Sequence, residues 1–209
     1  MKRFFLSIAA VVVLASPAVA EFEDGLIAYT RGDYMTAFQE WYPLAEEGDA
    51  VAQNRIASMF LLGRGVAKDF SEAINWFRQS AEQGDAASQF ELGMIYKRGV
   101  AAGQDYVEAQ NWFNMGAVQG DARSQYQLGQ LYKNGLGVAP DPVEAYKWFN
   151  LAAGAANGRE YALANTERKL MERDMSPDQI STAQSLARDW RAAHPVEDMR
   201  TMEEESEEE

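Results

Sequence analysis

A period of 36 residues runs through the middle of this 209-residue chain and limits what it can fold into. Aspartate recurs at this spacing as Asp33, Asp69, Asp105 and Asp141. Alanine keeps the same register in two series: Ala37, Ala73, Ala109 and Ala145, then Ala45, Ala81, Ala117 and Ala153. A fixed period of this length is typical of stacked structural units, each of which buries its apolar face against its neighbours. The sequence therefore predicts a repeat array.

Each unit carries the signals of two helices, and the second one begins at the recurring aspartate. Asp141 stands three residues before Glu144, which is the spacing of a capping box, and Pro142 falls at the first helical position. The same aspartate and glutamate spacing occurs at positions 69 and 72 and at positions 105 and 108. Apolar residues then recur at helical spacing, so we expect one face of this helix to be buried.

The first helix of each unit follows a second aspartate. Gly84 is expected to close the preceding helix and Asp85 to cap the next one, over residues 86–98. A glycine-rich turn then leads to the second helix. In the middle unit Ala101 stands where the neighbouring units have glycine, at positions 65 and 137, so we expect this turn to take a different shape.

Aromatic residues also keep the register of the repeat. One series is Trp76, Trp112 and Trp148, and the other is Trp41, Phe77, Phe113 and Phe149. Such rings could stack on glycans, but large side chains in phase with small alanines are what close helix packing requires. We interpret both series as core.

The first twenty residues read as a cleavable secretory signal. Lys2 and Arg3 precede an apolar stretch, and the small residues before position 21 suit a signal peptidase, so cleavage is predicted after Ala20. A membrane anchor is the competing interpretation, but the apolar run is shorter than the ~20 residues that span a bilayer. We therefore expect a periplasmic or secreted protein, and the sequence does not decide between these two locations.

The remaining chain divides into four parts. Residues 21–49 form an N-terminal capping half-repeat, residues 50–157 form three repeats, and residues 158–193 form a C-terminal helical cap. In that cap Ser176, Pro177 and Gln179 have the pattern of a helix start. Residues 194–209, which end in EEESEEE, are predicted to be a disordered acidic tail because they have little to bury.

Composition removes several classes of function. The chain has no cysteine, which excludes disulfides, thiolate chemistry and cysteine-bound zinc. The formal net charge is -13, so nucleic acid and anionic lipid are not expected partners.

The recurring pattern resembles the Sel-one-like repeat (SLR) family, a relative of the tetratricopeptide repeat. The family pattern is Ala-x-x-x-Leu-Gly-x-x-Tyr, Gly-x-Gly-Val-x-x-Asp and Ala-x-x-Trp-Phe-x-x-Ala-x-x-x-Gly. Residues 88–120 and 124–149 follow it at most positions, with Ser88 and Ser124 at the first alanine, Ala101 at a turn glycine and Gly116 at the last alanine. The resemblance implies an all-α fold, a right-handed α-solenoid of antiparallel helix pairs with about 36 residues per repeat. It also implies a scaffold or adaptor for protein partners. Some secreted, cysteine-rich members of the family are described as binding penicillin or hydrolysing β-lactams, and their cysteines are absent here.

No arrangement of residues predicts catalysis, a cofactor or a metal. The single histidine, His194, lies beside the acidic tail, and no nucleophile elbow, zinc helix or calcium loop occurs. The pair Asp69 and Glu72 could suggest a glycosidase, but acids at helix starts are committed to backbone donors. We expect no enzyme. A peptidoglycan- or β-lactam-directed enzyme or binder remains the alternative, and a structural or assembly factor of an envelope complex is a third interpretation.

If the repeating residues are scaffold, the partner site lies at first-helix positions that differ between units. The inner surface of such an array is lined by these helices. The candidates share a face at three- and four-residue spacing; they are Arg55, Ser58, Glu91, Met94, Lys97, Arg98, Gln127, Gln130 and Lys133. Lys97, Arg98 and Lys133 form a basic cluster in an acidic chain. We predict that this cluster recognises an acidic segment, on a protein partner or on the chain's own tail, while partner identity and oligomeric state stay open.

Overall fold

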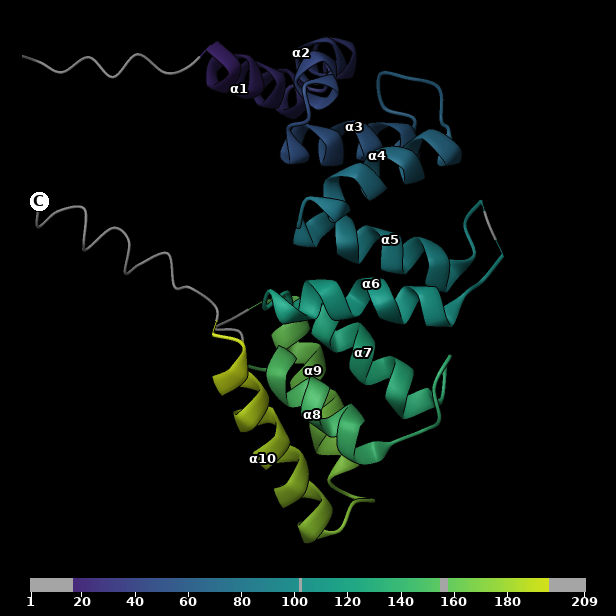
Figure 1. The fold of residues 1–209 in the computed structure, drawn as a ribbon, viewed down its shortest axis with the longest axis vertical. Helices are drawn as coiled ribbons and strands as arrows, with labels where there is room; N and C mark the ends of the chain where they lie inside the picture. Colours follow the sequence, from purple (N-terminus) through teal and green to yellow (C-terminus); the bar gives the residue numbers. More distant parts are fainter. Residues whose placement is uncertain (1–16, 102, 155–157, 196–209) are drawn as a thin grey trace, which may run out of the picture.

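The computed structural model describes residues 17–101, 103–154 and 158–195, and these residues form ten helices (Figure 1). In chain order they are α1 Pro17–Thr30, α2 Tyr34–Glu46, α3 Ala50–Leu62, α4 Phe70–Glu82, α5 Ala86–Arg98, α6 Tyr106–Val118, α7 Ala122–Asn134, α8 Pro142–Ala152, α9 Arg159–Met171 and α10 Pro177–Ala193. No strand occurs in this part of the chain.

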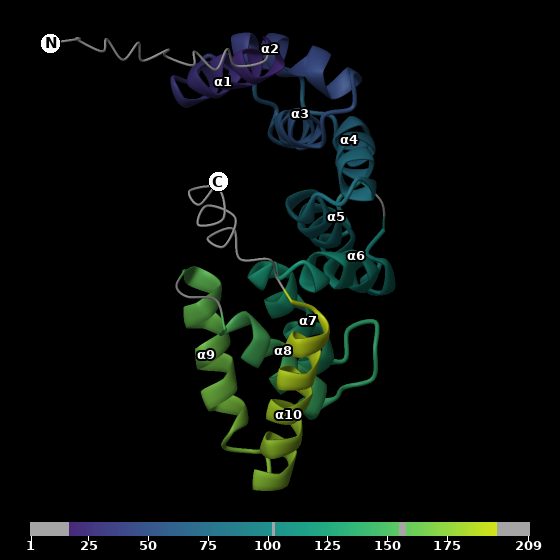
Figure 2. The same cartoon turned by 60° about the vertical axis from the view of Figure 1, so that its left-hand side comes forward.

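Successive helices pack as antiparallel pairs, and the pairs stack into a curved array. In Figure 2, α3 and α5 lie toward the hollow side of the curve, and α4 and α6 lie on its outer side. The predicted all-α solenoid of helix pairs is therefore confirmed. Among the described residues, no helix combines the length and the apolar character that a membrane span requires.

The predicted helix starts are confirmed, although the capping box at the second helices is only half formed. Asp69 Oδ1 accepts hydrogen bonds from the backbone N–H groups of Ser71 (2.8 Å) and Glu72 (3.1 Å). The backbone N–H of Asp69 itself donates to the carbonyl oxygen of Phe60, at 3.1 Å, and so does not bond Glu72. Asp105 and Asp141 repeat both features. The glutamate is thus left without its capping partner, because the turn brings the end of the preceding helix closer. Ser176 and Gln179 form the complete capping box at α10.

We expected the turn of the middle repeat to differ in shape at Ala101, but the backbone there has the same conformation as in the neighbouring repeats. Ala101 has a φ of +65°, close to the +73° of Gly65 and the +74° of Gly137. An L-residue in this left-handed region costs about 1 to 2 kcal/mol. The fold of the neighbouring helices therefore imposes the turn on a residue that does not favour it.

The predicted aromatic core is largely confirmed. Trp41, Phe77, Phe113 and Phe149 are completely buried, and Trp112 and Trp148 are 8% and 5% exposed. Trp76 is the exception, because it is only half-buried and packs edge-on against Tyr42. Small residues let the helices approach these rings. A Cβ atom added at Gly93 would lie 2.4 Å from the ring of Phe113, which leaves no room for a larger residue.

Buried glutamines join each repeat to the one before it. The side-chain amide of Gln53 donates to the carbonyl oxygen of Ala45 at 3.1 Å, and Gln89 and Gln125 make the same bond to Ala81 and Ala117. Gln83 and Gln119 then donate to the side chains of Gln53 and Gln89, each at 2.8 Å. Since the buried amides of Gln53, Gln89 and Gln125 are paired, they link the repeats at little desolvation cost.

A second buried polar contact is complete at one junction and incomplete at the next. Ser88 Oγ donates to Ser80 Oγ (2.8 Å) and accepts from Asn54 Nδ2 (2.8 Å). One repeat later the partner positions hold Gly116 and Phe90, and the buried hydroxyl of Ser124 has no hydrogen-bond partner.

The last two helices depart from the repeat. α9 continues the stack on α8, but α10 packs on α8 as well and makes few contacts with α9 (Figures 1 and 2). Trp190 of α10 meets Trp148 of α8 edge-on, with ring centroids 5.4 Å apart. The last two helices therefore both pack on α8 and do not form a pair with each other.

The predictions for the two ends of the chain fall partly outside the described residues. Most of the predicted signal, residues 1–16, is outside them, as are residues 196–209 of the predicted tail. α1 begins at Pro17 and runs through the predicted cleavage position after Ala20. Residues 21–49 hold the rest of α1 and all of α2, which pack as a pair, and Trp41 Nε1 donates to the carbonyl oxygen of Phe22 at 3.1 Å.

Candidate functional site

The predicted partner-binding residues lie on α3, α5 and α7, and the structure brings only some of them together. Arg55 on α3 is exposed and Ser58 is half-buried. Within the described residues, no hydrogen bond links either side chain to α5. At this junction the link is made by Asn54, which donates to Asp85 and Ser88. The α3 candidates therefore stand apart from those on α5 and α7.

Lys97 connects α5 to α7. Its ammonium group lies 2.5 Å from the side-chain oxygen of Gln127, and the side chain is half-buried. Burial, together with the neighbouring charge of Arg98, lowers the pKa of Lys97. Arg98 is exposed at the end of the same helix. The hydrogen-bond partner of Lys97 is thus neutral, and no carboxylate among the described residues forms an ion pair with Lys97 or Arg98.

Glu91 lies nearer the start of α5 and is half-buried. Burial raises the pKa of Glu91, although the positive charges of Arg123 and Arg98 act in the opposite direction. Arg123 forms an ion pair with Asp121 at 2.9 Å, and its guanidinium lies over the ring of Phe90, 4.5 Å from the centroid. Sequence reasoning missed Arg123, yet its register also varies between units, with Val51 and Ala87 at the equivalent positions.

The predicted residues on α7 are already engaged by a helix of the same chain. Glu167 of α9 receives a hydrogen bond from Gln130 Nε2 (3.0 Å) and an ion pair from Lys133 Nζ (2.6 Å). Lys133 is therefore not a third free cation beside Lys97 and Arg98. The sequence offered no signal for Glu167, because its register elsewhere holds the apolar residues Met59, Ile95 and Leu131.

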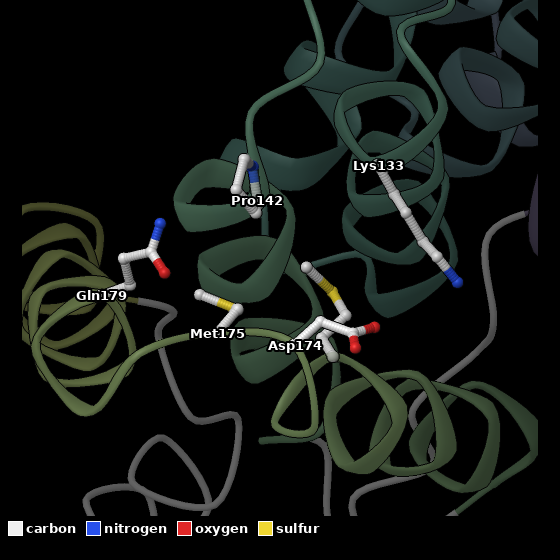
Figure 3. Close-up of a pocket in the computed structure, with 6 residues that line it drawn as sticks. Lys133, Pro142, Asp174, Met175 and Gln179 are labelled. Carbon is white, nitrogen blue, oxygen red and sulfur yellow. The ribbon is translucent and has the colours of Figure 1, made fainter.

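A cavity of about 300 Å³ lies among α7, α8 and the junction of α9 with α10 (Figure 3). Its lining consists of Lys133, Pro142, Met171, Asp174, Met175 and Gln179. The amide of Gln179 already bonds the backbone of Ser176, and Lys133 pairs with Glu167. The polar groups of the cavity are thus mostly committed to holding the fold.

The capping aspartates do not form an acid and base pair. The backbone N–H groups of Ser71 and Glu72 both donate to the same carboxylate oxygen of Asp69, and Asp105 and Asp141 repeat the arrangement. Glu108 accepts a hydrogen bond from Trp112 Nε1 (2.8 Å), and Glu144 pairs with Lys147 (2.5 Å). These acids therefore serve helix ends and side-chain packing. In the described part of the chain, no group of three or more acidic or histidine side chains is placed to hold a metal ion.

Comparison with known proteins identifies the repeat. The family model of the Sel1 repeat matches residues 50–85, 86–121 and 122–157, which together make up just over half of the chain. No curated protein sequence matches it.

Solved structures show the same fold. A Sel1 repeat protein from Oxalobacter formigenes is 31% identical, with a TM-score of 0.63, over 68% of this chain and 59% of that one. A protective antigen of uropathogenic Escherichia coli strains that displays an SLR fold is 26% identical, with a TM-score of 0.54, over 90% of this chain and 48% of that one. The chain thus spans 59% of the length of the first relative and 48% of the second. With three matched repeats and the solenoid they form, it belongs to the Sel1 repeat family.

Proposed function

We propose that this protein is a non-catalytic interaction scaffold of the cell envelope, which binds protein partners on the concave face formed by α3, α5 and α7. Sel1 repeat solenoids are generally protein-interaction scaffolds, which supports the first part of the proposal. The envelope location rests on the predicted export signal, with Lys2 and Arg3 before an apolar stretch and cleavage after Ala20.

The observation that carries the proposal is the pair Lys97 and Arg98. These side chains stand at positions that vary between repeats, whereas the repeating positions fill the core. The half-buried ammonium group of Lys97 donates a hydrogen bond to the neutral side-chain amide of Gln127. The amide carries no charge to offset that of Lys97, whereas a carboxylate adds Coulombic attraction to the hydrogen bond and would be the better partner. We therefore infer that the bound segment is acidic.

The test is cross-linking in cells followed by mass spectrometry, with the chain carrying Lys97→Glu and Arg98→Glu together. A matched control carries Lys68→Glu and Arg188→Glu, which make the same change of charge at exposed residues outside α3, α5 and α7. We expect the first variant to lose the partners that the wild type and the control retain, because the reversed charges repel an acidic segment. Equal partner recovery from all three proteins would contradict the proposal.

The non-catalytic part of the proposal has its own test. Purified protein is incubated with a chromogenic β-lactam and with peptidoglycan fragments, and no turnover is expected. Hydrolysis that persists in the Lys97 and Arg98 variant and is lost when a carboxylate is replaced would show an enzyme instead.

A further inference from the structure

The contact between α7 and α9 has the geometry of a carboxylate-binding site. Gln130 and Lys133 each bind a different oxygen of Glu167, so both ends of the carboxylate are held. Tyr126 accepts a second hydrogen bond from the Gln130 amide (2.9 Å), and Asn134 donates to the Gln130 side-chain oxygen (3.1 Å). The amide of Gln130 is therefore oriented by its own helix, independently of the acid that it binds.

Glu167 belongs to a helix that is held less firmly than the helices inside the array. α9 has two buried residues, Ala164 and Met171, whereas α5 and α7 have five each. Tyr161 and Leu170 of α9 are 42% and 43% exposed, so its apolar side chains are incompletely covered. The reason is that α10 packs on α8 and leaves α9 without the paired helix that covers α3, α5 and α7. At the repeat position of Glu167, the helices α3, α5 and α7 carry the apolar residues Met59, Ile95 and Leu131.

The same face continues onto α5, where no acid of the described chain forms an ion pair with Lys97 or Arg98. The four residues of the α7 site, Tyr126, Gln130, Lys133 and Asn134, correspond one repeat earlier to Phe90, Met94, Lys97 and Arg98. The hydrogen bond between Lys97 and Gln127 shows that the two helices approach closely at this point. An acidic chain bound at Lys133 could therefore continue along the surface to Lys97 and Arg98.

We propose that Gln130 and Lys133 form a binding site for a carboxylate of the partner's acidic segment, and that Glu167 occupies this site until the partner displaces it. This inference rests on the proposed function. It adds that the chain carries its own competitor for the site, so affinity is limited by the contact between α7 and α9.

The test uses the full chain and a fluorescein-labelled peptide of six glutamates, with binding followed by fluorescence anisotropy at low salt. Glu167→Gln removes the competitor, and Glu160→Gln is the matched control, because it removes the same charge from the same helix. The side chain of Glu160 makes no hydrogen bond or ion pair with another described residue. We expect Glu167→Gln to bind the peptide roughly fivefold tighter than Glu160→Gln, the lower end of typical coupling between two sites. Adding Lys133→Met to Glu167→Gln should remove this gain.

Equal affinities of Glu167→Gln and Glu160→Gln would overturn the inference. If all variants bind the peptide alike and binding depends on Lys97 and Arg98, the proposed function stands and only the competition by Glu167 is refuted. If no variant binds the peptide and cross-linked partners persist after reversal of Lys97 and Arg98, the proposed function fails as well. Should Glu167→Gln lose helix content by circular dichroism, Glu167→Ala against Glu160→Ala repeats the comparison.

Discussion

One substitution made at two positions 36 residues apart should change stability in opposite directions. Ser88 and Ser124 occupy the same register and are both completely buried, so Ser→Ala changes the same atoms in the same kind of helix. The hydroxyl of Ser88 has two hydrogen-bond partners, Ser80 and Asn54, whereas the hydroxyl of Ser124 has none. The comparison isolates the value of satisfying a buried hydroxyl.

The magnitudes follow from these contacts. Ser88→Ala removes two hydrogen bonds with a net value of about 0.5 to 1.5 kcal/mol each. Asn54 and Ser80 each keep one other bond, to Asp85 and to the carbonyl oxygen of Ala50, which moderates the loss. Ser124→Ala removes a buried hydroxyl whose desolvation costs about 1 to 3 kcal/mol, and it leaves a small void beside Gly116. Helix propensity favours alanine by about 0.5 kcal/mol in both cases. We expect Ser88→Ala to destabilise by about 1 kcal/mol and Ser124→Ala to stabilise by about 1 kcal/mol.

The assay is urea unfolding followed by circular dichroism, supported by thermal melting. With about 2 to 4 °C per kcal/mol for a chain of this size, the two melting temperatures should differ by about 4 to 8 °C. The denaturant slope should stay equal, since neither change alters the surface exposed on unfolding. Two variants displaced in the same direction by similar amounts would refute the reasoning.

Two further predictions concern the core and pH. Trp112→Ala should destabilise the protein by about 3 to 5 kcal/mol in urea unfolding, because Trp112 packs against Phe77 and Leu92; altered partner binding at an unchanged melting temperature would contradict its place in the core. Burial raises the pKa of the Glu91 carboxyl, so the folded state binds the carboxyl proton more tightly than the unfolded chain does. The stability that this proton contributes is therefore lost as the pH rises through the raised pKa. In urea unfolding, Glu91→Gln should therefore be more stable than the wild type at pH 7 and lose that advantage below pH 4.5, the ordinary pKa of the carboxyl in the unfolded chain. A stability difference that does not change with pH would disprove this prediction.

The helix starts and core residues that recur in every repeat were predictable from the sequence, whereas contacts that occur in a single repeat were not. Helix starts at Asp69, Asp105 and Asp141 follow from short-range rules, because the capped N–H groups lie two or three residues away. The aromatic core follows from the period, since a residue that recurs in phase meets the same neighbours in each unit. Trp76 departs from this rule because its neighbour in the preceding unit, Tyr42, belongs to the atypical first pair.

The candidate site was predictable in its elements and not in its contacts. The variable first-helix positions include Lys97, Gln127, Gln130 and Lys133, which meet across α5, α7 and α9. Glu167 was not predictable because α10 packs on α8, where Trp190 meets Trp148, and α9 therefore lacks the paired helix of a regular repeat. The conformation of Ala101 was missed for a similar reason, since the helices on either side outweigh the preference of one residue.

The glutamine bonds between repeats have a consequence for how such a chain changes length. Gln53 and Gln83 at one junction make the same bonds as Gln89 and Gln119 at the next. If residues 86–121 were duplicated or deleted as a block, the new neighbours would present the same groups at the same places. Duplication of the gene segment can therefore add or remove binding surface one repeat at a time, whereas an insertion of any other length would separate these amides from their partners.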